Sequence, residues 1–491
     1  MKRPALTFAT LGVLVVSTLL APASNAGGPS MAIGAAEDAV KQPTLVEARA
    51  KLILASLAGL DAIRPTALWK PGQTEPTPDG LEALENAVDA ADLGAVRVFL
   101  SIYPFGSSVT PLTDEAQAQF AKYAAALAAA LPTVQDFIIG NEPNLNRFWL
   151  PQYDADGNDA AAPAFMSLLA RTYDAVKIVS PDSRIWGLGL SPHGSDNPNA
   201  ARKTHSPTIF LRDLAAAYRK SGRDEPIMDG LAIHPYPEAS NTPPSVAHPN
   251  STTIGVADYP KLVKLLTVGF IGTAQKGATL PIIYSEYGTQ TQIPSSKAEF
   301  YSDAEQSTTK PVSPEMQGKL YRQAIALSFC QPNVEGFLIF HLLDEESLTG
   351  WQSGLYYADE TAKPSRDTVR EAVSRVRRGV IARCDELKLV PHLTGFSLAG
   401  GKKRFARLPT ALSLRCDIDC RFVLRLQREP LNTTTFQVRG TTTGGNWARV
   451  ALGRRRVAPG PYRFLLTIWA SVNTGRVRTL VPVHISIAAQ P

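Results

Sequence analysis

From about residue 31 to residue 380, short apolar runs alternate with longer segments, rich in alanine and leucine, whose apolar residues recur with helical period. Eight runs have the length of a strand, and a segment that predicts a helix follows each one. The predicted strands are 31–34, 62–69, 95–103, 134–140, 184–190, 228–234, 280–285 and 334–341. The predicted helices are 43–58, 79–93, 113–131, 161–179, 206–221, 257–275, 313–329 and 365–377.

Eight strand–helix units in succession predict an α/β fold, the closed (β/α)8 TIM barrel, in which helices cover a parallel sheet. Several predicted helices begin with a residue that caps a helix N-terminus, such as Thr113 before two acidic residues. The alternative is an open doubly wound sheet. It is less favoured because no glycine-rich phosphate-binding turn follows the first strand.

The pattern changes after Cys384, where helical period disappears and apolar and polar residues alternate between turns rich in glycine and proline. Six short strands are predicted at 411–416, 420–427, 434–439, 447–452, 461–470 and 477–487. Such strands indicate a small all-β, sandwich-like domain. We therefore expect a barrel domain over residues 27–384 and a β-sandwich domain over residues 395–491.

The N-terminus has the three parts of a secretory signal peptide, which we assign to residues 1–26. Lys2 and Arg3 precede an apolar run that ends near Leu20, and small residues follow it up to Ala26. An uncleaved membrane anchor is the alternative, but the run is short for a membrane span and no basic stop-transfer segment follows. We expect a secreted or cell-surface protein without a transmembrane segment.

Export makes disulfide bonds permissible, and the chain has four cysteines, which allow three complete pairings. Cys416 and Cys420 flank an Asp-Ile-Asp turn that is short enough to be bridged. Cys330 and Cys384 would then pair with each other. Buried free thiols are the alternative reading.

Composition and charge narrow the class of protein. A hydrophobic fraction of 44% and a charged fraction of 19% exclude a disordered chain, a collagen-like fibre and a polytopic membrane protein. The net charge of +6 is unevenly distributed: residues 395–491 contain 16 Lys and Arg against 3 Asp and Glu, or +13, and the remainder is −7. This difference in charge indicates two modules with different surroundings.

Reactive side chains of a TIM barrel lie at the carboxyl ends of its strands. The fourth predicted strand leads into Asn141-Glu142-Pro143, and the seventh is followed directly by Glu286. Both carboxylates can therefore point into the same open end of the barrel. Two carboxylates are the minimum apparatus for hydrolysing a glycosidic bond, because one protonates the leaving oxygen and the other attacks or activates water.

Asn-Glu-Pro after strand four and Glu286 after strand seven resemble clan A of the glycoside hydrolases, the retaining barrel enzymes that include cellulases, mannanases and β-xylosidases. The resemblance covers roughly residues 31–380, and the segments 140–146, 234–237 and 351–357 resemble a group of secreted actinobacterial members. It implies that Glu142 is the general acid and base and that Glu286 is the nucleophile.

The resemblance also implies supporting residues at other strand ends. Arg64 matches the strand-two arginine that contacts the nucleophile, and His234 and Tyr236 match the His-x-Tyr pair after strand six, whose tyrosine hydrogen-bonds the nucleophile. Physically, Arg64 and Tyr236 would keep Glu286 ionised. Asn141 could hydrogen-bond the 2-hydroxyl of the sugar. Structural roles inside the barrel are the alternative for Arg64 and His234.

The end of strand eight departs from the clan pattern. Clan members usually have at this position a tryptophan that forms the floor of the sugar-binding site. In this chain the strand ends in Phe340-His341, and the nearest tryptophan is Trp351 in the following loop. We expect His341 and Trp351 to contribute to substrate binding, with loop packing as the alternative for Trp351. Trp69 and Trp149 also lie near strand ends and are candidate platforms, with ordinary packing as the alternative.

These features predict a secreted retaining glycoside hydrolase that acts on a carbohydrate or glycoconjugate. Two alternatives are a transglycosidase with the same residues and a carbohydrate-binding protein on a degenerate barrel. No metal or cofactor is expected, since no His-Glu-x-x-His, Cys-x-x-Cys or P-loop pattern occurs. The basic runs 402–404 and 454–456 suggest an anionic cell-envelope polymer, not nucleic acid, as a partner of the C-terminal domain.

Overall fold

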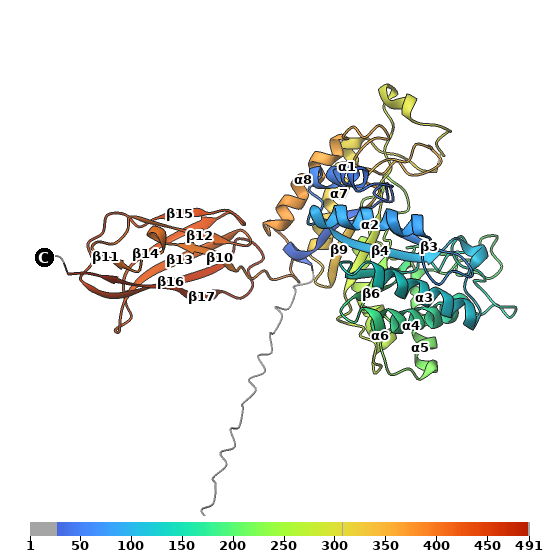
Figure 1. The fold of residues 1–491 in the computed structure, drawn as a ribbon, viewed down its shortest axis with the longest axis horizontal. Helices are drawn as coiled ribbons and strands as arrows, with labels where there is room; N and C mark the ends of the chain where they lie inside the picture. Colours follow the sequence, from blue (N-terminus) through green and yellow to red (C-terminus); the bar gives the residue numbers. More distant parts are fainter. Residues whose placement is uncertain (1–26, 307, 490–491) are drawn as a thin grey trace, which may run out of the picture.

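The computed structural model describes residues 27–306 and 308–489, so the predicted signal peptide 1–26 lies outside the described residues. Two units follow each other along the chain (Figure 1). The first is a ring of parallel strands surrounded by helices, and the second consists of two sheets whose strands pair antiparallel, except for the parallel pair β11–β17. The structure therefore has the predicted fold class, a TIM barrel followed by an all-β domain.

The barrel is closed by parallel pairing in the order β2-β1-β9-β8-β7-β6-β5-β4-β3, with β2 also pairing with β4. Pro65 interrupts the second predicted strand because it has no amide hydrogen to donate, so β2 and β3 together form one strand of the eight. The closed ring rules out the open doubly wound alternative. The strands are β1 (Ala32–Ala36), β2 (Ala62–Arg64), β3 (Thr66–Trp69), β4 (Arg97–Pro104), β5 (Asp136–Ile139), β6 (Arg184–Leu190), β7 (Gly230–Ile233), β8 (Ile282–Tyr287) and β9 (Val334–Phe340).

Eight α-helices alternate with these strands and agree closely with the predicted segments. Thr44, Thr77, Thr113, Ser206 and Ser313 each cap a helix by accepting a hydrogen bond from a backbone amide of the first turn. The sixth helix ends earlier than predicted, because Gly272 turns the chain with φ of 73°. The helices are α1 (Leu45–Leu57), α2 (Pro78–Leu93), α3 (Asp114–Ala130), α4 (Ala161–Val179), α5 (Pro207–Ser221), α6 (Tyr259–Phe270), α7 (Pro314–Phe329) and α8 (Pro364–Arg377).

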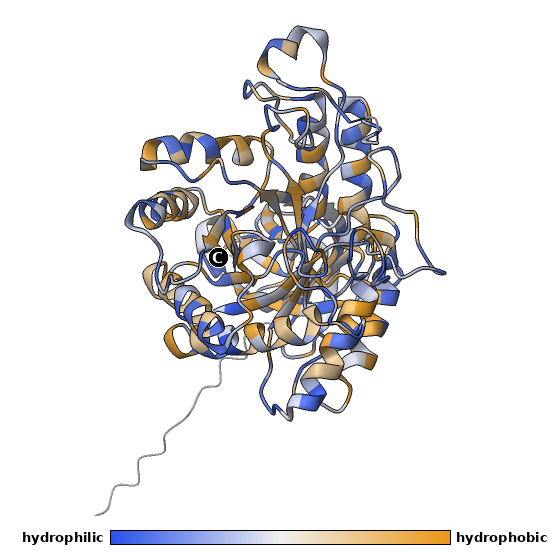
Figure 2. Cartoon of the chain, turned by 90° about the vertical axis from the view of Figure 1, so that its right-hand side faces the viewer, coloured by the Kyte–Doolittle hydropathy of each residue, from blue (hydrophilic) through white to orange (hydrophobic). Residues whose placement is uncertain are grey.

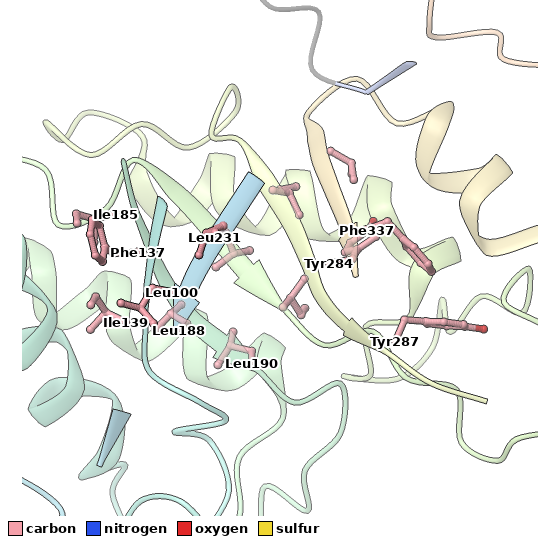
Figure 3. Close-up of a cluster of buried hydrophobic side chains, with 14 of the residues drawn as sticks. Leu100, Phe137, Ile139, Ile185, Leu188, Leu190, Leu231, Tyr284, Tyr287 and Phe337 are labelled. Carbon is pink, nitrogen blue, oxygen red and sulfur yellow. The ribbon is translucent and has the colours of Figure 1, made fainter. Parts of the chain in front are cut away.

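Apolar residues fill two layers of the barrel. The inner layer takes one residue from each of the eight barrel strands: Ala32, Ala62, Phe99, Ile138, Trp186, Ala232, Ile283 and Leu338. Their neighbours along the strands, such as Leu100, Phe137 and Leu231, point outward and pack against the helices (Figure 3). The end-on view shows the apolar strands at the centre and helices of mixed hydropathy around them (Figure 2). This packed interior leaves only the strand ends available for polar chemistry.

The C-terminal domain consists of a three-stranded sheet, β10-β12-β15, and a five-stranded sheet, β11-β17-β16-β13-β14. The six predicted strands correspond to β12 to β17, and the short edge strands β10 and β11 were not predicted. They are five and two residues long, too short to show alternation clearly. The strands are β10 (Leu393–Ser397), β11 (Arg404–Phe405), β12 (Ala411–Cys416), β13 (Cys420–Arg428), β14 (Thr433–Thr442), β15 (Ala448–Ala451), β16 (Gly460–Ala470) and β17 (Arg478–Ile487).

Disulfide bonds join Cys330 to Cys384 and Cys416 to Cys420, which is the expected pairing. The first bond attaches the segment after the barrel to the residue that follows α7. Backbone hydrogen bonds then connect this segment to the sandwich: the amide of Leu389 donates to the carbonyl of Asn473 at 2.7 Å, and that of Asp419 donates to the carbonyl of Arg378 at 2.8 Å. The two domains are thus joined through ordered contacts.

Candidate active site

The two predicted carboxylates lie at the carboxyl ends of barrel strands. Glu286 is the penultimate residue of β8, and Glu142 follows β5 after a sharp bend of the chain. Gly140 has φ of 103°, and a Cβ on it would lie 2.5 Å from the ring of Phe165, so only glycine fits there. The bend at Gly140 takes the chain out of the strand, and Glu142 itself has φ of 45°.

Glu286 is nearly buried and accepts hydrogen bonds on both carboxylate oxygens. Nη1 of Arg64 lies 2.5 Å from Oε1, and the hydroxyl of Tyr236 donates to Oε2 at 2.9 Å. Burial raises the pKa of Glu286. The neighbouring His234, the charge and hydrogen bond of Arg64 and the hydrogen bond from Tyr236 outweigh burial, so the pKa of Glu286 lies below its ordinary value. The arrangement therefore favours an ionised carboxylate.

His234 lies between the two carboxyl groups. Its Nδ1 is 3.1 Å from Oε1 of Glu142 and 3.4 Å from Oε2 of Glu286, and its side chain is fully buried. Because one atom contacts both carboxyl groups, these two oxygens are separated by at most about 6.5 Å, which is the lower limit of the separation found in inverting enzymes. Glu142 remains the more accessible of the two carboxyls, with 14% of its side chain exposed against 9% for Glu286.

Asn141 is held by the same arginine that contacts Glu286. Nη2 of Arg64 donates to Oδ1 of Asn141 at 3.2 Å and to the hydroxyl of Ser101, in β4, at 3.0 Å. The carbonyl oxygen of the Asn141 side chain is therefore used, which leaves its amide as a donor. Ser101 was not predicted, because a single polar residue within the apolar run of β4 is its only signal in the sequence.

Trp351 lies beside the tyrosine that contacts Glu286. Its ring centroid is 5.0 Å from that of Tyr236 and 5.4 Å from that of Phe340, and its side chain is partly exposed. Trp69 and Trp149, by contrast, are 0% and 1% exposed and pack in the core. Neither of them is a platform for a ligand, whereas Trp351 lies beside Tyr236, whose hydroxyl contacts Glu286.

His341 is fixed to the end of the first strand. Its Nδ1 donates to the carbonyl of Ala36 at 2.8 Å, and its Nε2 is 3.3 Å from Oε1 of Glu345. Burial lowers the pKa of His341, but the hydrogen bond to Glu345 and the charges of Glu37 and Glu345 outweigh it and raise the pKa. Glu345, which sequence analysis did not single out, thus adds a second polar group to the loop that carries Trp351.

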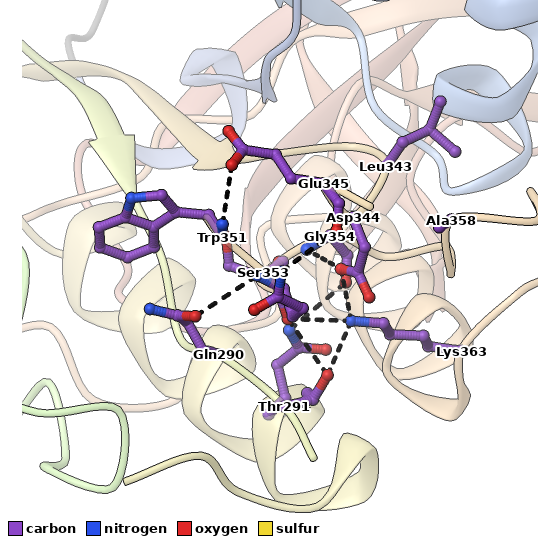
Figure 4. A network of polar contacts seen from close by, with 12 residues as sticks. Gln290, Thr291, Leu343, Asp344, Glu345, Trp351, Ser353, Gly354, Ala358 and Lys363 are labelled. Atoms are coloured by element: carbon purple, nitrogen blue, oxygen red, sulfur yellow. Dashed lines mark hydrogen bonds and ion pairs between the residues drawn. The ribbon is translucent and has the colours of Figure 1, made fainter. Parts of the chain in front are cut away.

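A buried ion pair holds this loop in place (Figure 4). Nζ of Lys363 lies 2.7 Å from Oδ1 of Asp344, and both side chains are 0% exposed. Lys363 also donates to Thr291 at 2.8 Å and to the carbonyl of Gln352 at 3.0 Å. Gln352 follows Trp351 in the chain, so the pair anchors the backbone beside the tryptophan. The ion pair was not predicted, since a lysine before a helix is typical of an exposed residue.

The described ranges 27–306 and 308–489 contain no group of three or more His, Cys, Asp or Glu side chains arranged to hold a metal ion. Within the same ranges, no helix has the length and apolar character that crossing a bilayer requires.

Comparisons with known proteins bear on the fold. No protein-family model matches the chain, and a search of curated proteins finds no match. The chain is similar to the solved structure of a family 39 glycoside hydrolase from the gut symbiont Bacteroides cellulosilyticus WH2, with a TM-score of 0.51 and 15% identity over 87% of this chain and 80% of the other. It is also similar to GH5_18 from Streptomyces cattleya, with a TM-score of 0.49 and 18% identity over 71% of this chain and 81% of the other. The first similarity supports the barrel fold that the resemblance to clan A implied.

Proposed function

We propose that this chain is a secreted glycoside hydrolase that cleaves O-glycosidic bonds with retention of configuration. Glu286 is the nucleophile and Glu142 the general acid and base. The observation that carries the proposal is the contact of both carboxyls with Nδ1 of His234, at 3.1 and 3.4 Å. Retaining enzymes place their carboxyls about 5–5.5 Å apart, whereas inverting enzymes need about 6.5–9.5 Å to fit a water molecule.

The proposed reaction has two displacements. In the first, a carboxylate oxygen of Glu286 bonds to the anomeric carbon, the glycosidic bond breaks, and Glu142 gives its proton to the leaving oxygen. In the second, Glu142 takes a proton from water, whose oxygen attacks the anomeric carbon and releases Glu286. Arg64 and Tyr236 support the first step because they stabilise the ionised nucleophile.

Three groups around the carboxyls fit a sugar. The free amide of Asn141 is a donor for the 2-hydroxyl, a contact that strengthens as positive charge develops on the ring. The partly exposed ring of Trp351 offers an apolar face to the carbon–hydrogen face of a sugar. His341 and Glu345 provide further polar contacts near that face. The first structural neighbour is itself named as a glycoside hydrolase.

Secretion is part of the proposal. Two disulfide bonds in one chain fit an oxidising compartment, because cytosolic thiols are kept reduced. The predicted signal peptide also supports secretion. An anionic cell-envelope polymer as partner of the basic C-terminal domain is a further part of the proposal.

The test is hydrolysis of a panel of aryl β-glycosides and of plant, fungal and bacterial polysaccharides, with product anomers followed by NMR at early times. Release of the β-anomer first supports the proposal, and release of the α-anomer first contradicts retention. Products longer than the substrate would indicate the transglycosidase alternative. A folded chain that binds sugars but cleaves none of the panel would indicate the carbohydrate-binding alternative.

A further inference from the structure

The Lys and Arg side chains of residues 395–491 have no carboxylate partners in the described structure. This segment contains 16 Lys and Arg but only 3 acidic residues. Each acidic residue is already engaged: Asp417 by His392 at 2.9 Å, Asp419 by Arg378 at 4.0 Å and Glu429 by His484 at 3.1 Å. The positive charge is therefore available to an external anion.

Strand alternation decides which arginines share a face. In β13 the side chains of Phe422, Leu424 and Leu426 belong to the core of the sandwich. Successive side chains of a strand point to opposite faces, so Arg421 and Arg425 lie on the outer face of the five-stranded sheet.

The register of the neighbouring strands adds two more arginines to that face. Arg439 of β14 pairs with Val423 of β13, and Arg463 of β16 pairs with Gln427. Residues that pair side by side on β14, β13 and β16 form rows across the sheet. Four successive rows on the outer face each carry one arginine, in the order Arg421, Arg439, Arg425 and Arg463. We call these four residues the arginine stripe, which runs along β13. Rows two residues apart lie about 7 Å from each other, so the stripe is roughly 20 Å long.

The remaining side chains of the face complement the stripe. Trp469 of β16 pairs with Arg421 and is partly exposed, and Thr441 of β14 pairs with the same arginine from the other side. Outward-facing Val423 is only 7% exposed, which indicates that the aliphatic stems of its arginine neighbours lie over it. The face thus combines regularly spaced guanidinium groups, hydroxyl groups and an aromatic ring.

We propose that this face binds a linear acidic polysaccharide that carries carboxylates on its sugars. Guanidinium groups pair with carboxylates through two parallel hydrogen bonds, and one arginine per row matches a polymer that repeats its charge along an extended chain. Trp469 favours a sugar over a phosphate polymer, since an aromatic ring gains from an apolar ring face and gains little from a phosphodiester. The binding is independent of Glu142 and Glu286 and would hold the barrel near a polymeric substrate.

The test measures binding of the full chain to polygalacturonate by calorimetry. We expect binding at low salt that weakens about tenfold or more between about 20 and 200 mM NaCl, because bound counterions are released. The quadruple variant Arg421→Gln, Arg425→Gln, Arg439→Gln, Arg463→Gln should lose at least about tenfold in affinity. Binding that is unaffected by salt would overturn the proposal.

A matched control removes the same charge elsewhere in the domain. Arg407, Arg449, Arg454 and Arg456 are exposed and lie outside the stripe. Their simultaneous replacement by Gln should change the affinity by less than about threefold. Equal losses in both quadruple variants would mean that only net charge matters, which overturns the stripe. If the stripe variant fails to fold, the affinities of the single variants Arg439→Gln and Arg449→Gln are compared instead. A larger loss in Arg439→Gln supports the stripe, and equal losses overturn it.

A second arm distinguishes sugars from other polyanions. Trp469→Ala should weaken binding to polygalacturonate and leave binding to polyphosphate unchanged. Polyphosphate or single-stranded DNA that binds the wild-type chain as tightly as polygalacturonate would overturn the assignment to an acidic polysaccharide. None of these readouts requires turnover, so their failure is distinguishable from failure of the proposed hydrolase activity.

Discussion

Nη1 of Arg64 lies 2.5 Å from Oε1 of Glu286, and this contact joins the end of β2 to the end of β8 across the mouth of the barrel. Both side chains are nearly buried, at 2% and 9% exposure. A buried charge that loses its partner destabilises a protein strongly, whereas removal of both charges costs less. The pair is therefore expected to matter for stability as well as for the ionisation of Glu286.

Arg64→Met should lower the free energy of unfolding by about 3–5 kcal/mol, because it leaves the Glu286 carboxylate buried and uncompensated. The double variant Arg64→Met, Glu286→Gln should recover part of that loss. Urea unfolding measures both. A single variant within about 1 kcal/mol of wild type would mean that the pair is not a buried ion pair in solution.

Glu286→Ala should abolish turnover, and added azide should restore part of it by attacking the anomeric carbon from the vacated space. Glu142→Ala should instead retain activity on a dinitrophenyl glycoside, whose leaving group needs no protonation. The two alanine variants serve as each other's control in steady-state kinetics. The reverse pattern would exchange the assigned roles.

Tyr236→Phe should move the acidic limb of the pH profile of kcat/KM to higher pH. The hydroxyl stabilises the ionised form of Glu286, so its loss raises the pKa of that carboxylate toward the ordinary value. Activity that needs ionised Glu286 is then lost at a higher pH as the solution is acidified. A charge-assisted hydrogen bond is worth about 1.5–3 kcal/mol, so kcat/KM should fall roughly 10–150-fold. An unchanged acidic limb would assign that limb to another group.

Trp351→Ala should raise KM by roughly 30-fold, which corresponds to about 2 kcal/mol of apolar contact with a sugar ring. The matched control is Trp447→Ala in the C-terminal domain, where the tryptophan is 52% exposed. The control should leave KM unchanged, and thermal unfolding should report whether either variant is misfolded. An unaffected KM in Trp351→Ala would make this residue a packing element of the loop.

The two disulfides should differ in their contribution to stability. Cys330 and Cys384 are 54 residues apart, whereas Cys416 and Cys420 are 4 apart. Loop-closure entropy predicts a loss of about 4 kcal/mol when the first pair is replaced by serine and about 2 kcal/mol for the second. Urea unfolding of the two double variants checks the order. A larger loss for the shorter loop would mean that local packing outweighs chain entropy.

The barrel could be predicted from the sequence because its signals are local. Each strand and helix of a (β/α)8 unit buries its own apolar pattern, and caps such as Thr113 mark where a helix begins. Glu142 and Glu286 were predicted as site residues for the same reason, since each follows an apolar strand whose carboxyl end is a known place for chemistry. The short spacing of Cys416 and Cys420 likewise favoured a bridge over free thiols, and the structure joins the two residues.

The contacts between distant residues were decided by tertiary structure. The sequence of Lys363 and Asp344 carries no sign of a buried ion pair, because either residue alone is typical of an exposed loop. Trp69 and Trp149 lie near strand ends, yet packing against Phe120 and Phe165 removes them from any ligand.

The arginine stripe likewise depends partly on features that the sequence shows and partly on pairing that only the folded domain shows. Composition by itself determined that the C-terminal domain is strongly basic, and alternation determined that Arg421 and Arg425 share one face of β13. Only the pairing register of β14 and β16 brought Arg439 and Arg463 into the rows between and beside them. Register depends on which side chains of several strands meet in the core, a property of the folded sandwich that no single segment of sequence contains.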